Sequence, residues 1–205
     1  MSEPTLSGVT LKSALRDYRF WLLGGSIFMI AIGVGGSITN FVPMLSDKGF
    51  EPKQAATIAG AIGVSIIIGR VLAGYLIDHY WAPLVAFPML ALPALACVIL
   101  MQPILSTEQA VLCAALIGLC AGAEADLIAF LCAKYFGLRH YGRIYGVQYA
   151  IFGLGSGISP FAFGRVFDLY GSYAPILKVS ALFFSVGAIA LLAMGRYPSF
   201  GRFEE

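Results

Sequence analysis

Three charged residues of this sequence lie inside long apolar stretches, where a charge is expensive. Glu124 and Asp126 interrupt one stretch and Arg70 interrupts another. Placing such a group at the centre of a membrane helix costs about 2.5–3.5 kcal/mol, so each needs a partner or a function. Buried carboxyl groups can carry protons, and an arginine fork can bind a carboxylate through two hydrogen bonds. Proton transfer and anion binding are therefore the chemistry to consider.

The two acids need separate explanations. Two helical positions correspond to about 200 degrees of rotation, so the carboxyl groups of Glu124 and Asp126 point to nearly opposite faces. Asp126 continues the stripe Gly118-x-x-x-Gly122-x-x-x-Asp126, and small residues mark close helix contacts. A hydrogen bond or ion pair to a neighbouring helix is thus one interpretation of Asp126 and proton coupling is the other. Glu124 has only apolar neighbours on its own face, which leaves a protonatable role and a structural role open.

Four other residues are candidates for binding a ligand. Arg70 lies about two turns before the end of its apolar stretch and either binds a carboxylate or pairs with Asp78 or another helix-end residue. Asn40, Gln148 and Tyr149 are uncharged hydrogen-bonding groups. They either line a cavity or bridge helices.

The elements that must position these residues follow from composition. The 205 residues are 59% hydrophobic and 12% charged, and the mean hydropathy is +0.85, which is typical of membrane proteins. The net charge of +2 is scattered along the chain and forms no basic face for nucleic acid. We therefore predict an all-α integral membrane protein with a linker at 1–19, a bundle at 20–195 and a tail at 196–205. The six predicted spans are 20–45, 54–77, 82–101, 109–136, 144–167 and 175–195.

Basic residues predict how the spans are oriented. Lys and Arg are enriched on the cytoplasmic side of membrane proteins. Starting with the N-terminus inside, the inner side receives nine of them and the outer side four. This distribution predicts a multi-pass protein of the inner (plasma) membrane with both termini in the cytoplasm. The nine are Lys12, Arg16, Arg19, Arg70, Lys134, Arg139, Arg143, Arg196 and Arg202, against Lys48, Lys53, Arg165 and Lys178.

An internal repeat relates the two halves of the chain. Gly74-x-x-x-Asp78-x-Tyr80 recurs 90 positions later as Gly164-x-x-x-Asp168-x-Tyr170. Both copies end the middle helix of a three-span unit, which predicts the inverted 3+3 arrangement of secondary transporters. Gly69, Gly74, Asp78, Gly164 and Asp168 are accordingly interpreted as helix-end or gate residues. The pairs Gly142-x-x-x-Gly146 and Gly153-x-x-x-Gly157 predict further helix contacts.

The segment Gly69-Arg-Val-Leu-Ala-Gly-Tyr-Leu-Ile-Asp-His79 resembles the helix-end motif of the major facilitator superfamily. With the segments 122–126, 134–146 and 159–173, the chain resembles the C-terminal half of a bacterial member related to the monocarboxylate and oxalate:formate transporters. The resemblance implies that substrate is held between two six-helix bundles, and that Arg70 matches an arginine implicated in binding the substrate carboxylate. Where the monocarboxylate branch has an aspartate, this chain has Ile66, so Glu124 is the expected replacement for proton coupling.

These observations together predict half of a secondary active transporter that moves a small organic anion, such as a monocarboxylate, by alternating access. The expected partners are the lipid bilayer, the solute, and either an N-terminal six-helix half or a second copy of this chain. The sequence shows no catalytic motif, phosphate loop or metal-ligand cluster, so we expect no enzyme activity, cofactor or metal. The alternatives are a truncated or non-transporting membrane subunit and a carrier for drug or metabolite efflux.

Overall fold

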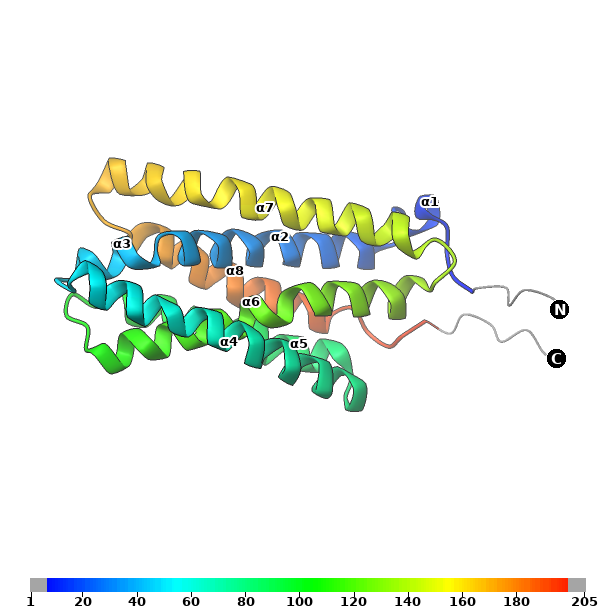
Figure 1. Cartoon of the computed structure of the whole chain (residues 1–205). Helices are drawn as coiled ribbons and strands as arrows, with labels where there is room; N and C mark the ends of the chain where they lie inside the picture. Colours follow the sequence, from blue (N-terminus) through cyan, green and yellow to red (C-terminus); the bar gives the residue numbers. More distant parts are fainter. Residues whose placement is uncertain (1–6, 199–205) are drawn as a thin grey trace.

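The protein is an all-helical bundle in the computed structural model, which describes residues 7–198 (Figure 1). Six helices are long and apolar enough to cross a membrane, as predicted. The parts of the predicted linker and tail at 1–6 and 199–205 lie outside the described residues. The six long helices are α2 (Tyr18–Thr39), α4 (Pro52–His79), α5 (Ala82–Leu100), α6 (Thr107–Phe136), α7 (Tyr141–Tyr170) and α8 (Ala174–Leu192), with short helices α1 (Leu11–Ala14) and α3 (Phe41–Ser46).

The helix boundaries follow local sequence signals. A capping box between Ser106 and Gln109 begins α6. Proline lies in the first turn of α4, α5 and α8, where its missing N–H has no helical partner to lose. The predicted span 20–45 is interrupted by Gly33, Gly35, Gly36 and Pro43, a pattern that predicts a tilted or locally unwound span. The structure has such a break, because α2 ends at Thr39 and α3 begins after Asn40. Pro43 explains the break, since it has no N–H to donate to the carbonyl of Thr39.

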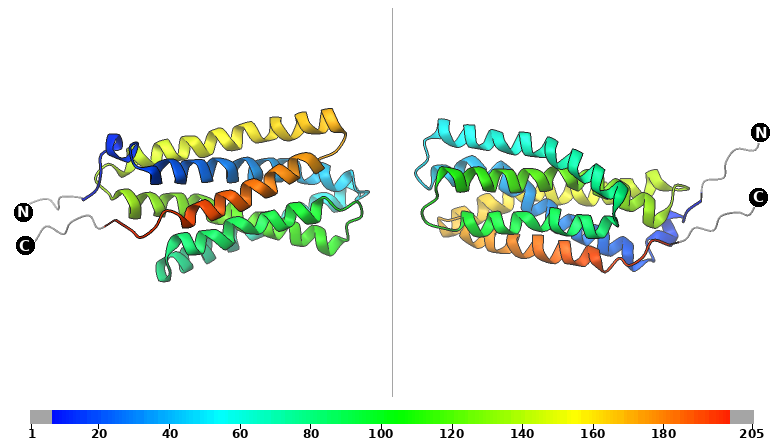
Figure 2. Two further views of the ribbon diagram at one scale, coloured as in Figure 1. Left: turned by 180° about the vertical axis from the view of Figure 1, so that it is seen from behind. Right: turned by 90° about the horizontal axis from the view of Figure 1, so that it is seen from below.

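The contacts between helices repeat the two-fold relationship seen in the sequence. The most extensive contacts join α4 to α6, α2 to α7 and α5 to α8, followed by α5 with α6 and α2 with α8. Exchanging α2 with α6, α4 with α7 and α5 with α8 turns this set into itself. The exchanged helices run in opposite directions, and the two described ends of the chain lie at the same end of the bundle (Figures 1 and 2). The inverted 3+3 repeat is confirmed.

Glycines allow the closest of these contacts. A Cβ atom added to Gly118 would lie 2.5 Å from the carbonyl oxygen of Ile62, and one added to Gly122 would overlap the carbonyl oxygen of Ile66. On the other side of the contact, a Cβ at Gly69 would overlap the carbonyl oxygen of Leu119. The backbones of α4 and α6 therefore touch directly, as the Gly118–Asp126 stripe predicts.

The glycine pairs of α7 behave differently. Nothing lies within 4 Å of a Cβ atom added to Gly142, Gly146, Gly153 or Gly157. The prediction that these pairs form helix contacts is wrong within the described part of the chain. They lie instead on an open flank of α7, which with α4 is the least buried of the six long helices.

Backbone hydrogen bonds join the segment before α1 to the turn between α6 and α7. The Val9 amide donates to the carbonyl of Phe136 over 2.9 Å, and the Leu138 amide donates to the carbonyl of Ser7 over 2.9 Å. Gly8 and Gly137 face each other in this bridge with φ values of +150° and +76°. Side chains at these two positions would meet the opposing backbone, so glycine is required on both sides of the bridge.

Candidate functional site

Arg70 of α4 and Asp126 of α6 form a partly exposed ion pair at the open flank of α4. The Arg70 Nε atom lies 3.3 Å from the Asp126 Oδ2 atom, and the side chains are 59% and 37% exposed. The close approach of the helices at Gly122 places the two residues opposite each other. The helix-to-helix ion pair predicted for Asp126 is confirmed. The partner of Arg70 is thus Asp126, and not Asp78, which lies eight residues farther along α4, a rise of about 12 Å.

Glu124 lies on the opposite side of the same helix, inside the bundle. Its exposed fraction is 4%, and its Oε1 atom has no hydrogen-bond partner among the described residues. The prediction that the two acids point to opposite faces is confirmed by this difference in burial. Glu124 is therefore a carboxyl group held away from the open flank and from Arg70.

A ladder of aromatic rings runs along α7. The ring centroids of Tyr141 and Tyr145 are 5.5 Å apart, those of Tyr145 and Tyr149 are 5.6 Å apart, and those of Tyr149 and Phe152 are 5.3 Å apart. Tyr141 and Tyr145 pack against the buried core of the bundle, and α7 contacts α6 as well as α2. Sequence reasoning identified only Tyr149. The spacing of four, four and three residues is the signal that would have identified the other rings.

Gln148 and Asn40 do not meet Arg70. Gln148 is completely buried, and its Nε2 atom donates to the Phe20 carbonyl of α2 over 2.9 Å. Asn40 ends α2, where its Nδ2 atom donates to the carbonyl of Gly36 over 3.0 Å and its Oδ1 atom accepts from the Tyr173 hydroxyl over 3.4 Å. One amide therefore bridges helices near the described chain ends, and the other lies at the far end of the bundle.

The predicted helix-end residues differ in their surroundings: one glycine is packed, two glycines are open, and the two aspartates are exposed. Gly69 packs directly against the backbone of α6, whereas a Cβ at Gly74 or Gly164 would have open space around it. Asp78 and Asp168 are exposed at the ends of α4 and α7, and these ends point in opposite directions along the bundle (Figure 2). Their role as gate residues stays a prediction.

The chemistry available at the ion pair is that of anion recognition. A guanidinium has five N–H donors in one plane, and the contact with Asp126 involves the Nε atom. A second carboxylate can approach the remaining donors in the bidentate geometry that arginine favours. Within residues 7–198, no three His, Cys, Asp or Glu side chains gather as a metal site would require.

Comparisons with known proteins agree with this architecture. The chain is 28% identical over 93% of its length to an uncharacterised 38 kDa protein of Thermoproteus tenax, and 26% identical over 92% of its length to monocarboxylate transporter 12-B of Danio rerio. It spans about half of these relatives, 48% and 46% of their lengths.

Among solved structures, the Escherichia coli fucose:proton symporter has a similar fold, with a TM-score of 0.68 at 16% identity. The superposition covers 91% of this chain and 46% of the symporter. The model of the Major Facilitator Superfamily matches residues 2–160. With its six apolar helices in an inverted repeat, the chain belongs to the Major Facilitator Superfamily.

Proposed function

We propose that this chain forms one of the two helical bundles of a secondary active transporter, and that the transporter moves a small organic anion such as a monocarboxylate. Arg70 carries the proposal, because it is a guanidinium on an otherwise mainly apolar open flank and its contact with Asp126 leaves donors for a second carboxylate. The similarity to a monocarboxylate transporter supports the same class of substrate.

The open flanks of α4 and α7 support the presence of a second bundle. These are the least buried spans, and their open surface includes the large apolar side chains Val71 and Phe161 and the glycine pairs of α7. The relatives are about twice as long as the region they share with this chain. In this proposal, substrate passes between the two bundles, and the aromatic ladder and the ion pair form part of one wall of the pathway. The second bundle is either an N-terminal half or a second copy of this chain.

The first experiment measures uptake of labelled small carboxylates into proteoliposomes. One set contains the purified chain alone, and the other also contains the N-terminal half of a related transporter. Saturable uptake by the chain alone supports a second copy as the partner, whereas uptake only with the added half supports a two-part transporter. The absence of uptake in both sets would favour a truncated or non-transporting subunit.

The role of Arg70 is tested by Arg70→Lys, with Arg165→Lys as the matched control on the exposed outer part of α7. Lysine keeps the charge and removes the planar fork, so we expect the KM for carboxylates to rise by about tenfold or more. The control should leave the KM unchanged. A drug or metabolite efflux carrier would tolerate loss of Arg70 and accept broad apolar substrates, and that result would replace the proposed substrate class.

Proton coupling is the second part of the proposal, with Glu124 and Asp126 as the candidate groups. Glu124 is buried, and its Oε1 atom has no hydrogen-bond partner within residues 7–198. Both observations support a carboxyl group that works in its neutral form. Glu124→Gln should abolish proton-driven uphill uptake and spare exchange, and Asp126→Asn provides the comparison on the open flank. Unchanged coupling in Glu124→Gln would remove this role.

The proposed orientation has both termini in the cytoplasm and the bundle in the inner membrane. The excess of Lys and Arg on the side of the described chain ends supports it. Labelling a single cysteine introduced at Lys53 or at Arg139 with an impermeant thiol reagent, in a background whose four native cysteines are replaced, tests the orientation. In intact cells, only the Lys53 position should react.

A further inference from the structure

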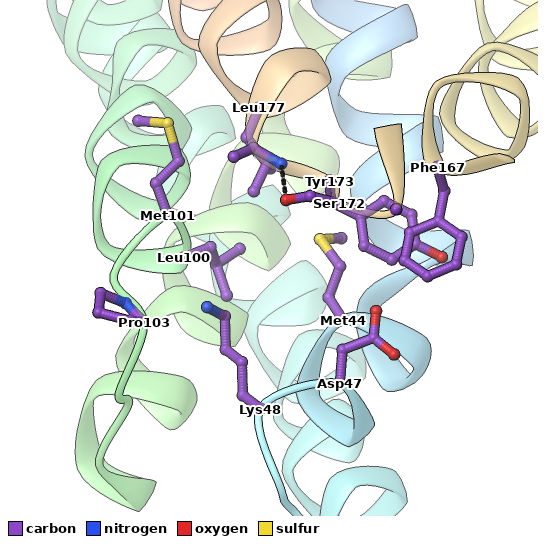
Figure 3. Close-up of a pocket in the computed structure, with 12 residues that line it drawn as sticks. Met44, Asp47, Lys48, Leu100, Met101, Pro103, Phe167, Ser172, Tyr173 and Leu177 are labelled. Atoms are coloured by element: carbon purple, nitrogen blue, oxygen red, sulfur yellow. Dashed lines mark hydrogen bonds between the residues drawn. The ribbon is translucent and has the colours of Figure 1, made fainter. Parts of the chain in front are cut away.

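A cavity of about 400 Å³ lies at the end of the bundle opposite the described chain ends (Figure 3). It is lined by the end of α3, the turn between α5 and α6, and the turn between α7 and α8, and it is open on one side. Arg70 lies 18 residues beyond the start of α4, about 27 Å along the helix. The cavity is therefore separate from the proposed transport site and independent of the transport proposal.

Two opposite charges line this cavity without pairing. Asp47 is exposed and Lys48 is half-buried. The Lys48 Nζ atom donates to the backbone carbonyl of Gln102. Within the described chain, neither Asp47 nor Lys48 has an oppositely charged side-chain atom within 4 Å. Figure 3 shows the Lys48 amine directed toward Leu100, and the Asp47 carboxylate directed toward Phe167.

The Lys48 ammonium has unused hydrogen-bond donors. Burial lowers the pKa of its ammonium, and the nearby Asp47 carboxylate only partly opposes this effect. An ammonium has three N–H donors, and one of them is used by Gln102. Burial deprives the Lys48 ammonium of hydrating water. An anionic oxygen in the cavity would replace that water with a charged hydrogen bond.

The remaining walls are apolar and aromatic. Leu100 and Leu177 are buried beside the cavity, and the rings of Phe167 and Tyr173 stack with centroids 4.6 Å apart. The hydroxyl of Tyr173 donates to Asn40, which connects this ring pair to the break between α2 and α3. An aromatic wall next to a carboxylate is a favourable surface for an organic ammonium group.

We propose that this cavity binds a zwitterion that carries an anionic oxygen at one end and an ammonium at the other, of the phosphoethanolamine type. The anionic group lies against Lys48, and the ammonium lies between Asp47 and the ring pair of Phe167 and Tyr173. A simple anion would be repelled by Asp47 and a simple cation by Lys48, whereas a zwitterion satisfies both charges. The cavity volume is in the range of small-molecule sites.

The same chemistry is available from a lipid headgroup or from a free solute. The cavity borders the ends of α5 and α8, two strongly apolar spans. Ile104, in the adjacent turn, is 85% exposed. This is the depth at which lipid headgroups meet a bundle.

The experiment measures binding to the purified full chain with two probes. Native mass spectrometry from nanodiscs compares retention of phosphatidylethanolamine with that of phosphatidylglycerol, and calorimetry in detergent measures O-phosphoethanolamine. Lys48→Gln and Asp47→Asn should each weaken binding by about tenfold, the effect of one charged hydrogen bond. Lys53→Gln, in the exposed first turn of α4, is the matched control and should bind like the unaltered chain. Circular dichroism and the melting temperature establish that each variant is folded, and Lys48→Arg should restore binding.

The possible results distinguish a lipid headgroup from a free zwitterion as the ligand, and they also include results that would overturn the proposal. Preferential retention of phosphatidylethanolamine identifies a headgroup site, and saturable binding of O-phosphoethanolamine without a lipid preference identifies a site for a free zwitterion. Equal retention of both lipids together with no calorimetric binding overturns the proposal. Equal binding by the Lys48→Gln, Asp47→Asn and Lys53→Gln variants overturns it as well, because the two charges would then have no part in recognition. None of these measurements depends on transport.

Discussion

Gly122 makes the contact that sets the position of Arg70, and its replacement is the most direct test of the packing argument. In Gly122→Ala, the new Cβ atom would overlap the carbonyl oxygen of Ile66 and lie 2.9 Å from the backbone nitrogen of Arg70. Both are backbone atoms, so no change of rotamer relieves the overlap, and α4 must move away from α6. Overpacking of this kind costs about 1–3 kcal/mol.

The matched control is Gly157→Ala on the open flank of α7, where a Cβ atom would have nothing within 4 Å. Both substitutions gain the helical preference of alanine over glycine, about 1 kcal/mol at most. The difference between the two variants therefore isolates the contact. Reversible unfolding of the purified chain in mixed micelles, followed by circular dichroism, should show Gly122→Ala less stable than Gly157→Ala by about 1–3 kcal/mol. Equal free energies of unfolding would mean that α4 and α6 do not touch at Gly122.

Three further predictions concern the other polar and glycine contacts. A double-mutant cycle of Arg70→Gln and Asp126→Asn should give a coupling below about 1 kcal/mol in unfolding, because both side chains are more than a third exposed; a larger value would indicate a pair shielded from solvent. Gln148→Leu should lower the free energy of unfolding by about 0.6 kcal/mol, the average for a hydrogen bond between membrane helices, and no loss would mean that the bond to α2 is not formed. Gly8→Ala should speed amide hydrogen exchange at Leu138, because the new Cβ would press on the opposing side of the bridge; unchanged exchange would refute that contact.

Much of the fold was predictable because the length of a membrane helix follows from its apolar run, and its direction follows from the charges in the loops. Apolar runs of span length, the repeated Gly-x-x-x-Asp pattern and the charge distribution together predicted six spans in an inverted repeat. The break at Asn40 was harder to place. A proline such as Pro43 indicates that a helix is interrupted nearby, but the residue at which the helix ends depends on which carbonyl loses its donor.

The site was predictable only in part, because pairing across helices depends on their relative rotation. The spacing of Glu124 and Asp126 gave their opposite directions, which needs only the geometry of one helix. The choice of Asp126 as the partner of Arg70 depends on how α4 and α6 are docked, and the partner expected from the sequence was instead Asp78 or another helix-end residue. The glycine pairs of α7 could not be assigned from sequence for the same reason. A face of small residues permits close packing, but the sequence does not show whether another helix lies against it.

The internal repeat also distinguishes packing residues from Arg70. Ninety positions beyond Gly69 stands Ser159, another small residue, which is fully buried. Gly74 and Asp78 recur as Gly164 and Asp168, but the position that corresponds to Arg70 holds Pro160. Both middle helices pack against their partners and leave one flank open, so this packing does not require an arginine. Arg70 carries a charge into an apolar span on the open flank and pairs with Asp126. In the proposed function, its remaining donors bind an anion.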